Sequence, residues 1–147
     1  MALPSKVFTY QAELIWRGER TAAVTSGRLP ELIVGPPEEF ASGGDDHWSP
    51  EHLYLASLES CTMISFLAHC AHNDLHVEEY SSAATGSLQR RADDQRYAFT
   101  QVAMVVHARM SAGQADAARG LTGKAERDCF ISASTNATVE TDWQITG

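Results

Sequence analysis

The N-terminal part of the chain alternates apolar and polar side chains with a period of two, which is typical of half-buried β-strands. Between Phe8 and Trp16 the even-numbered residues are apolar. Arg17–Arg20 is then predicted to be a turn, and residues 21–26 and 32–34 are predicted to be two further strands. We therefore expect three antiparallel strands at the start of the fold.

A helical pattern begins at Trp48. Ser49 can cap the free N–H groups, Pro50 fits the first helical position, and Glu51 suits the positive end of the helix dipole. The predicted helix runs to about His72, and its apolar residues lie on every side rather than on one stripe. At about 1.5 Å per residue it is roughly 35 Å long, too long to be enclosed by the rest of one small chain. We expect a second subunit to cover it.

The remaining pattern predicts a hairpin, a helix and a final strand. Residues 77–88 and 97–110 form the predicted hairpin, residues 114–129 the helix, and residues 139–145 the strand. The predicted helix has a buried stripe that consists of Ala118, Leu121, Ala125 and Cys129. The order βββ-α-ββ-α-β predicts an α+β fold, with antiparallel β-sheets around a long buried central helix, in one domain spanning residues 1–147.

Composition and charge narrow the expected partners. The 147 residues include 44% hydrophobic and 20% charged residues, the balance of a globular domain, and a formal net charge of −8. That charge repels phosphate, so we expect no nucleic acid or membrane partner. Nothing in the first residues has the pattern of a signal peptide, and the three cysteines are too few for a secreted disulfide scaffold. We expect a cytoplasmic protein with free thiols.

Two of the cysteines occupy informative positions. Cys61 lies in the middle of the apolar helix, and Cys129 ends the second predicted helix on its buried stripe. Buried cysteines usually serve only in packing, and a buried thiol is unreactive unless a cation lies nearby. Cys70 is about half a turn out of phase with Cys61, so we expect it to pack in the core.

Four short motifs resemble the OsmC/Ohr family, which comprises osmotically inducible protein C and the organic hydroperoxide resistance proteins. The residues are Trp48–Leu53 followed by Ser60 and Cys61, the Arg17–Arg20 turn, Thr25–Gly27, and Asp128–Ser132. They occur in the family's order and cover nearly the whole chain, within the OsmC-like subgroup. In that family a cysteine follows the helix-opening Glu by ten residues, which is the spacing of Glu51 and Cys61.

The resemblance implies an interwoven dimer that acts as a thiol-dependent peroxidase, reducing organic hydroperoxides and protecting against oxidative stress. It implies that Cys61 is the peroxidatic thiol and Cys129 the resolving thiol. It also implies that Arg17 steadies the Cys61 thiolate and that Glu51 orients Arg17, with Arg20 as the alternative to Arg17. The implied reductant is a dithiol such as a lipoyl group, and no cofactor is expected.

One departure from the family pattern leaves two alternatives open. The family usually has Pro after the second cysteine, whereas this chain has Phe130, and Ala133 stands where Asn or Gln is expected. The first alternative is an OsmC-like dimer without peroxidase activity that binds a small hydrophobic ligand. The second is a structural or interaction dimer whose cysteines only pack.

The histidines suggest a metal site less strongly than they suggest ordinary structural roles. His69 and His72 are one helical turn apart, but histidines in a last turn also complement the helix dipole. We expect no metal there. His47 and His52 flank the start of the central helix and are expected to line the mouth of a pocket.

Helix geometry gives an independent argument for a dimer. Glu51 and Cys61 are separated by about 15 Å along a straight helix and lie on different faces of it. They can serve one thiolate only if the first turns are not helical or if Glu51 comes from a second subunit. The second option also covers the apolar helix, so we expect a two-fold symmetric homodimer.

Overall fold

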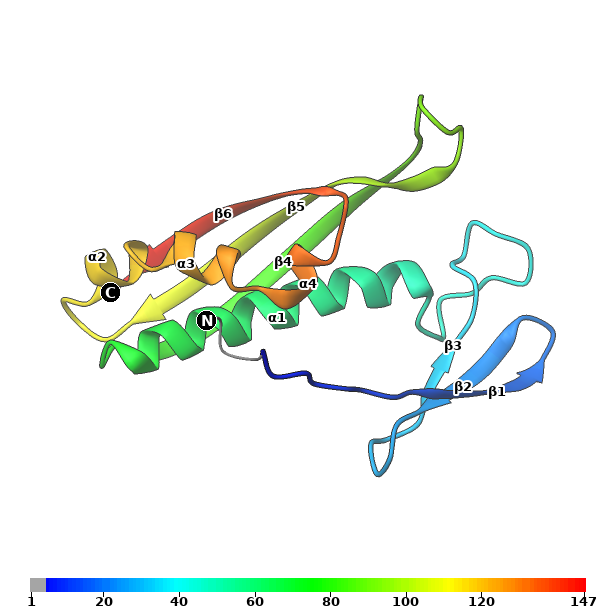
Figure 1. The fold of residues 1–147 in the computed structure, drawn as a ribbon, viewed down its shortest axis with the longest axis horizontal. Coiled ribbons are helices and arrows are strands. Elements are labelled where there is room, and N and C mark those ends of the chain that lie inside the picture. The colour runs from blue at the N-terminus through cyan, green and yellow to red at the C-terminus, as the bar shows by residue number, and fades with distance from the viewer. Residues whose placement is uncertain (1–4) are drawn as a thin grey trace. The chain divides into compact units, whose positions relative to one another are not determined.

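The computed structural model describes residues 5–147, and the chain forms two compact units. The first unit extends to Leu53 and the second runs from Tyr54 to Gly147. Figure 1 shows the order of the elements along the chain. The mixed α+β class agrees with the prediction.

The N-terminal unit contains a three-stranded antiparallel sheet in the order β1-β2-β3. The strands are β1 (Glu13–Gly18), β2 (Thr21–Thr25) and β3 (Leu32–Val34). The three opening strands are therefore confirmed, and β3 has the predicted bounds.

The first strand was placed too early in the sequence. Its pairing with β2 runs from Glu13 opposite Thr25 to Gly18 opposite Thr21, so the residues before Glu13 lie beyond the end of the partner strand. The turn is correspondingly short, at Glu19 and Arg20. Within this single chain β1 is not half-buried, since Trp16 is 69% exposed and its apolar neighbours in β1 are similarly exposed. Periodicity describes which side chains share a face, whereas burial requires a layer to pack on that face.

The central helix α1 (Pro50–His72) has the predicted bounds. Ser49 caps it, because its Oγ accepts a hydrogen bond from the His52 backbone N–H at 3.1 Å. Within this single chain the helix is buried on one side only. The buried residues are Leu58, Thr62, Ser65, Phe66 and Cys70. Ile64, on another side, is 62% exposed.

By length and composition alone, α1 is also apolar enough to cross a membrane. Buried helices in protein cores satisfy the same criterion, because they are selected for the same apolar composition. In the C-terminal unit the buried side of α1 supplies Phe66 and Leu58 to two clusters of core residues. This packing against the protein accounts for the apolar composition of that side of the helix.

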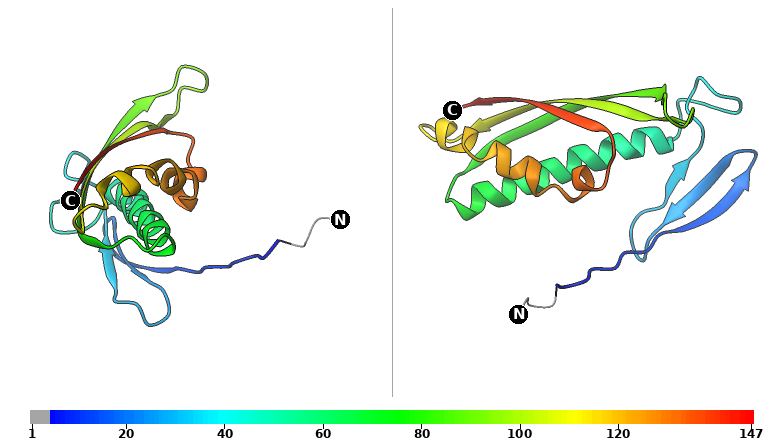
Figure 2. Two further views of the ribbon diagram at one scale, coloured as in Figure 1. Left: turned by 90° about the vertical axis from the view of Figure 1, so that its left-hand side faces the viewer. Right: turned by 45° about the horizontal axis from the view of Figure 1, so that its top comes forward.

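The C-terminal unit is a two-layer structure in which helices cover one face of a sheet (Figure 2). The sheet has the order β4-β5-β6, with β4 (Val77–Arg90), β5 (Tyr97–Met110) and β6 (Thr138–Thr146). The predicted hairpin is confirmed as β4 and β5, which pair antiparallel. Alternate residues of β5 face the helices and are buried, from Val102 to Met110.

The last strand departs from the antiparallel prediction, because β6 pairs parallel to β5. The chain between the two strands crosses over the sheet through helices, and such a crossover returns the chain to the end at which β5 began. The sheet is therefore mixed.

The predicted helix over residues 114–129 is divided into two short ones, and a third follows beyond its predicted end. These are α2 (Ala115–Arg119), α3 (Thr122–Arg127) and α4 (Phe130–Ala133). The first break falls at Gly120, where glycine disfavours a continuous helix. The predicted stripe is nevertheless buried, since Ala118, Leu121, Ala125 and Cys129 are each at most 7% exposed.

Candidate functional site

The C-terminal unit brings two cysteine thiols together. Cys61 lies near the middle of α1, and Cys129 is the residue immediately before α4. The two side chains are within hydrogen-bonding range of each other, and both thiols are free. Two free thiols in this range are candidates for a disulfide.

The surroundings of Cys129 favour the neutral thiol. Cys129 is 1% exposed, and this burial is the main reason that its pKa is raised above the usual value. Two hydrogen bonds lower the pKa and so oppose that rise. The Ser132 N–H donates to Cys129 Sγ at 3.4 Å, and the Thr62 hydroxyl donates to it at 3.8 Å. The hydrogen bond with Cys61 raises the pKa further. At neutral pH the raised pKa leaves less of Cys129 as thiolate, which is the nucleophilic form of cysteine.

Cys129 also serves as the N-cap of α4. Its backbone is extended, with φ −74° and ψ 110°, and its Sγ accepts the hydrogen bond from Ser132. Phe130 is then the first residue of the helix, the position at which proline is most easily tolerated, and the Cys129 conformation is the one favoured before proline. Phe130 therefore occupies a helical position that also accepts proline. The Phe130 side chain is 78% exposed.

Arg17 lies on β1 of the N-terminal unit, and its side chain is half-exposed. Its carboxylate partner is Glu31, with Arg17 Nη2 donating to Glu31 Oε2 at 3.0 Å. An ion pair between Arg17 and Glu51, which the resemblance led us to expect, does not occur among residues 5–147. Arg20, the alternative cation, donates to the Ala41 backbone carbonyl at 3.3 Å. Pairing with Glu31 was not foreseen, because Glu31 lies in the loop before β3, outside every recognised motif.

Glu51 is in the first turn of α1 and is helical. Its Oε2 atom is buried and has no hydrogen-bond partner in the part of the chain that the structure describes. A buried carboxylate oxygen without a partner is unfavourable, because it has lost its hydration without a compensating interaction. A hydrogen-bond donor placed at this oxygen would relieve that cost.

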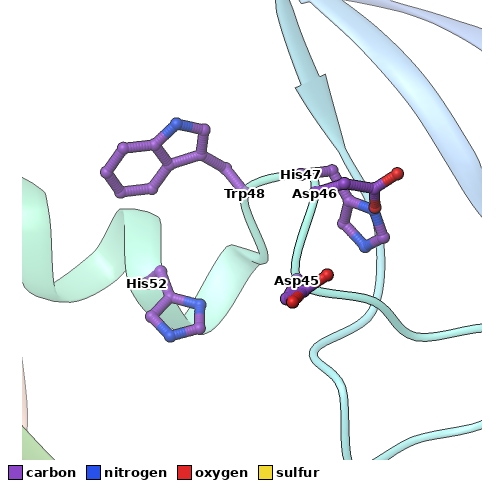
Figure 3. Close-up of a pocket in the computed structure, with 5 residues that line it drawn as sticks. All are labelled: Asp45, Asp46, His47, Trp48 and His52. Carbon is purple, nitrogen blue, oxygen red and sulfur yellow. The ribbon is translucent and has the colours of Figure 1, made fainter.

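His47 and His52 line a cavity of about 390 Å³ together with Asp45, Asp46 and Trp48 (Figure 3). Both ring nitrogens of His47 are occupied, Nδ1 at 2.9 Å from Asp46 Oδ1 and Nε2 at 2.8 Å from the Pro36 carbonyl oxygen. His52 Nδ1 lies 2.6 Å from Ser49 Oγ. These bonds hold the loop before α1 in place, and neither cysteine is among the lining residues.

His69 and Cys70 contact other parts of the C-terminal unit. His69 Nε2 lies 2.9 Å from Asp128 Oδ2. Within the described residues, no three His, Cys, Asp or Glu side chains are placed to hold a metal ion. Cys70 is buried in the core cluster of Phe66 and Met110, and its burial raises the pKa of the thiol.

Comparison with known proteins identifies the fold. The model of the family described as OsmC-like protein matches residues 43–144. An OsmC-like protein of unknown function from Vibrio cholerae superposes with a TM-score of 0.84 at 19% identity, covering 93% of this chain and 99% of that one. An organic hydroperoxide resistance protein OsmC from Legionella pneumophila gives a TM-score of 0.69 at 19% identity, covering 97% of this chain and 100% of that one. The organic hydroperoxide resistance protein OhrB from Bacillus subtilis gives a TM-score of 0.65 at 17% identity, covering 94% of this chain and 98% of that one. A comparison with curated protein sequences gave no match.

Proposed function

This chain belongs to the OsmC-like protein family, and from that membership and its cysteine pair we propose that it is a thiol-dependent peroxidase that reduces organic hydroperoxides. The observation that carries the proposal is the contact between Cys61 and Cys129 in the C-terminal unit. Structural relatives named as organic hydroperoxide resistance proteins support a peroxidase-type role for the family. We also propose a cytoplasmic location, where thiols are kept reduced.

The proposed reaction has three balanced steps. The Cys61 thiolate attacks the outer oxygen of the hydroperoxide, the O–O bond breaks, and the alkoxide leaves as an alcohol after taking up a proton. Cys61 is now a sulfenic acid. The Cys129 thiol attacks its sulfur, so that an S–S bond forms and water leaves with the proton of the thiol. An external dithiol, which we propose to be a lipoyl group, then reduces the disulfide and is itself oxidised.

The first step requires a cation to stabilise the Cys61 thiolate, and we assign this role to Arg17. A guanidinium group cannot lose its proton and can bind an anionic sulfur and a carboxylate together. We propose that Glu51 orients it, because its buried Oε2 has no partner within the described chain. Glu51 is helical, so the explanation that the first turns of α1 are unwound does not apply. Since about 15 Å of unbroken helix separate Glu51 from Cys61, a second subunit would have to supply the carboxylate.

We accordingly propose a homodimer in which each subunit contributes to both sites. Exposed apolar side chains on α1 and β1, such as Ile64 and Trp16, support a further protein surface against them. Sedimentation equilibrium at micromolar concentration is expected to give twice the 16.0 kDa chain mass. A monomer mass in a preparation that retains peroxidase activity would contradict this arrangement.

Peroxide consumption by the wild-type protein tests the function itself. With lipoyl dithiol as reductant, we expect an alkyl hydroperoxide to be consumed at least about tenfold faster than hydrogen peroxide, because we propose that the site at the dimer interface is apolar and binds the alkyl group. Omission of the dithiol should limit consumption to one peroxide per Cys61. If neither peroxide is consumed while the protein is folded, the alternative of an OsmC-like dimer that binds a small hydrophobic ligand takes its place.

A further inference from the structure

One face of α1 makes a line of polar contacts with the segment that carries Cys129. Thr62, Ser65 and His69 are three and four residues apart, so their side chains project from the same face of the helix. All three meet residues 125–129, and Figure 1 shows this segment lying alongside α1. The Thr62 hydroxyl contacts the cysteine sulfur, and Ser65 Oγ donates to the Ala125 carbonyl at 2.8 Å.

The contact between His69 and Asp128 joins α1 to the residue next to Cys129. Arg127 binds the same carboxylate, with Nε at 2.8 Å from Oδ1 and Nη2 at 3.0 Å from Oδ2. The hydrogen bonds from Arg127 and then His69 lower the pKa of Asp128 to about 2, so the carboxylate is ionised at neutral pH. Of the two residues that bind the Asp128 carboxylate, only His69 belongs to α1.

The segment around Cys129 has little rigidity of its own. The helices α2, α3 and α4 contain five, six and four residues. Helices this short are not stable without tertiary contacts. The position of Cys129 relative to Cys61 therefore depends on the core packing of Ala118, Leu121 and Ala125 and on the polar bonds that tie the segment to α1.

We propose that the His69–Asp128 pair is a positioning device that holds Cys129 beside Cys61 and thereby favours disulfide formation over further oxidation of Cys61. This inference rests on the proposed function, because two reactions compete for the Cys61 sulfenic acid. The Cys129 thiol can displace water from it, or a second hydroperoxide can oxidise it to the sulfinic acid and leave as alcohol. Only the first reaction depends on the distance between the two sulfur atoms.

The first test measures disulfide formation without any peroxide. In a Cys70→Ser background, the equilibrium between the Cys61–Cys129 disulfide and glutathione is compared for the parent, His69→Leu and Asp128→Ala. We expect each substitution to lower the equilibrium constant for disulfide formation about tenfold, because the two thiols are no longer held together. The double variant should lose no more than either single variant, since both remove the same contact.

Matched variants and a second measurement distinguish a role in positioning Cys129 from a general loss of folded structure. Asp128→Asn keeps an oxygen acceptor for His69 and should recover most of the loss. Arg127→Gln removes the partner that does not reach α1 and should behave as the parent does. The rate of the first oxidation of Cys61 by an alkyl hydroperoxide, followed by trapping of the sulfenic acid, should stay within about twofold of the parent in all variants. Sulfinic acid should accumulate at about tenfold lower peroxide in His69→Leu and Asp128→Ala.

Two results would overturn the positioning role. One is a parent-like disulfide equilibrium in both His69→Leu and Asp128→Ala. The other is a first oxidation rate that falls in parallel with disulfide formation, which would show that the pair only maintains the fold. A parent protein that forms the disulfide with glutathione but consumes no hydroperoxide would instead refute the proposed function, and the glutathione comparison would still decide whether the pair positions Cys129.

Discussion

Replacement of Cys61 by serine is expected to abolish peroxide turnover, with a fall of at least about a thousandfold in the second-order rate constant for the hydroperoxide. A serine hydroxyl is not ionised at neutral pH and does not attack the O–O bond, so no sulfenic acid forms. Stopped-flow measurement of alkyl hydroperoxide consumption, with a dithiol in excess, gives the rate constant directly.

Cys70→Ser is the matched control for this loss. Cys70 lies on the same helix but is buried in a core cluster with Phe66 and Met110. Serine at a helical position can donate its hydroxyl to the carbonyl oxygen one turn earlier, so the buried hydroxyl need not be left without a partner. Activity should stay close to that of the wild type. If Cys70→Ser is folded and as inactive as Cys61→Ser, the assignment of roles to the cysteines is wrong.

Replacement of Cys129 by serine is expected to limit the protein to a single turnover. Cys61 should react once with hydroperoxide at its normal rate and then remain as sulfenic acid, because the thiol that condenses with it is missing. In excess peroxide, mass spectrometry should show the addition of two oxygen atoms to the Cys61 peptide, the mark of sulfinic acid. The steady-state rate with dithiol should fall accordingly.

The serine variant is conservative for the fold. Serine is a favourable N-cap residue, so its hydroxyl can accept the Ser132 hydrogen bond that Cys129 Sγ accepts in the wild type and keep α4 capped. A far-UV circular dichroism spectrum like that of the wild type would confirm this. Unchanged multiple turnover in the folded variant would show that an external thiol, and not Cys129, resolves the sulfenic acid.

The sequence predicted well those elements whose limits are determined by a few neighbouring residues. Ser49 and Pro50 predicted the start of α1, and the cap geometry confirms it. The strand β1 was predicted less well, because its first residue depends on where its partner strand β2 ends. The helix over residues 114–129 was also predicted less well, because glycine at position 120 lowers the stability of a continuous helix. The parallel direction of β6 depends on where the crossover returns, which periodicity alone does not determine.

The candidate site was accessible from the sequence only in part. Cys61 and Cys129 were singled out by position and by resemblance, and the structure places their thiols in contact. The Glu31 partner of Arg17 and the His69–Asp128 pair were missed. Each joins side chains that are far apart in sequence, and the second connects residues 59 positions apart. Neither hydrophobic periodicity nor a short motif predicts such a pair, because the two side chains come together only in the folded chain.

The small core of the N-terminal sheet has a consequence for the synthesis of the protein. Its buried apolar side chains in the described chain are small, namely Ala22, Ala23 and Val34, while Leu14, Ile15 and Trp16 are exposed. A sheet with so little buried surface is at most marginally stable alone. It is translated before the C-terminal unit, which takes roughly 5 to 20 seconds more at ~5–20 residues per second. For that interval the nascent chain presents the apolar side chains of β1 to solvent, with no second layer translated that could cover them.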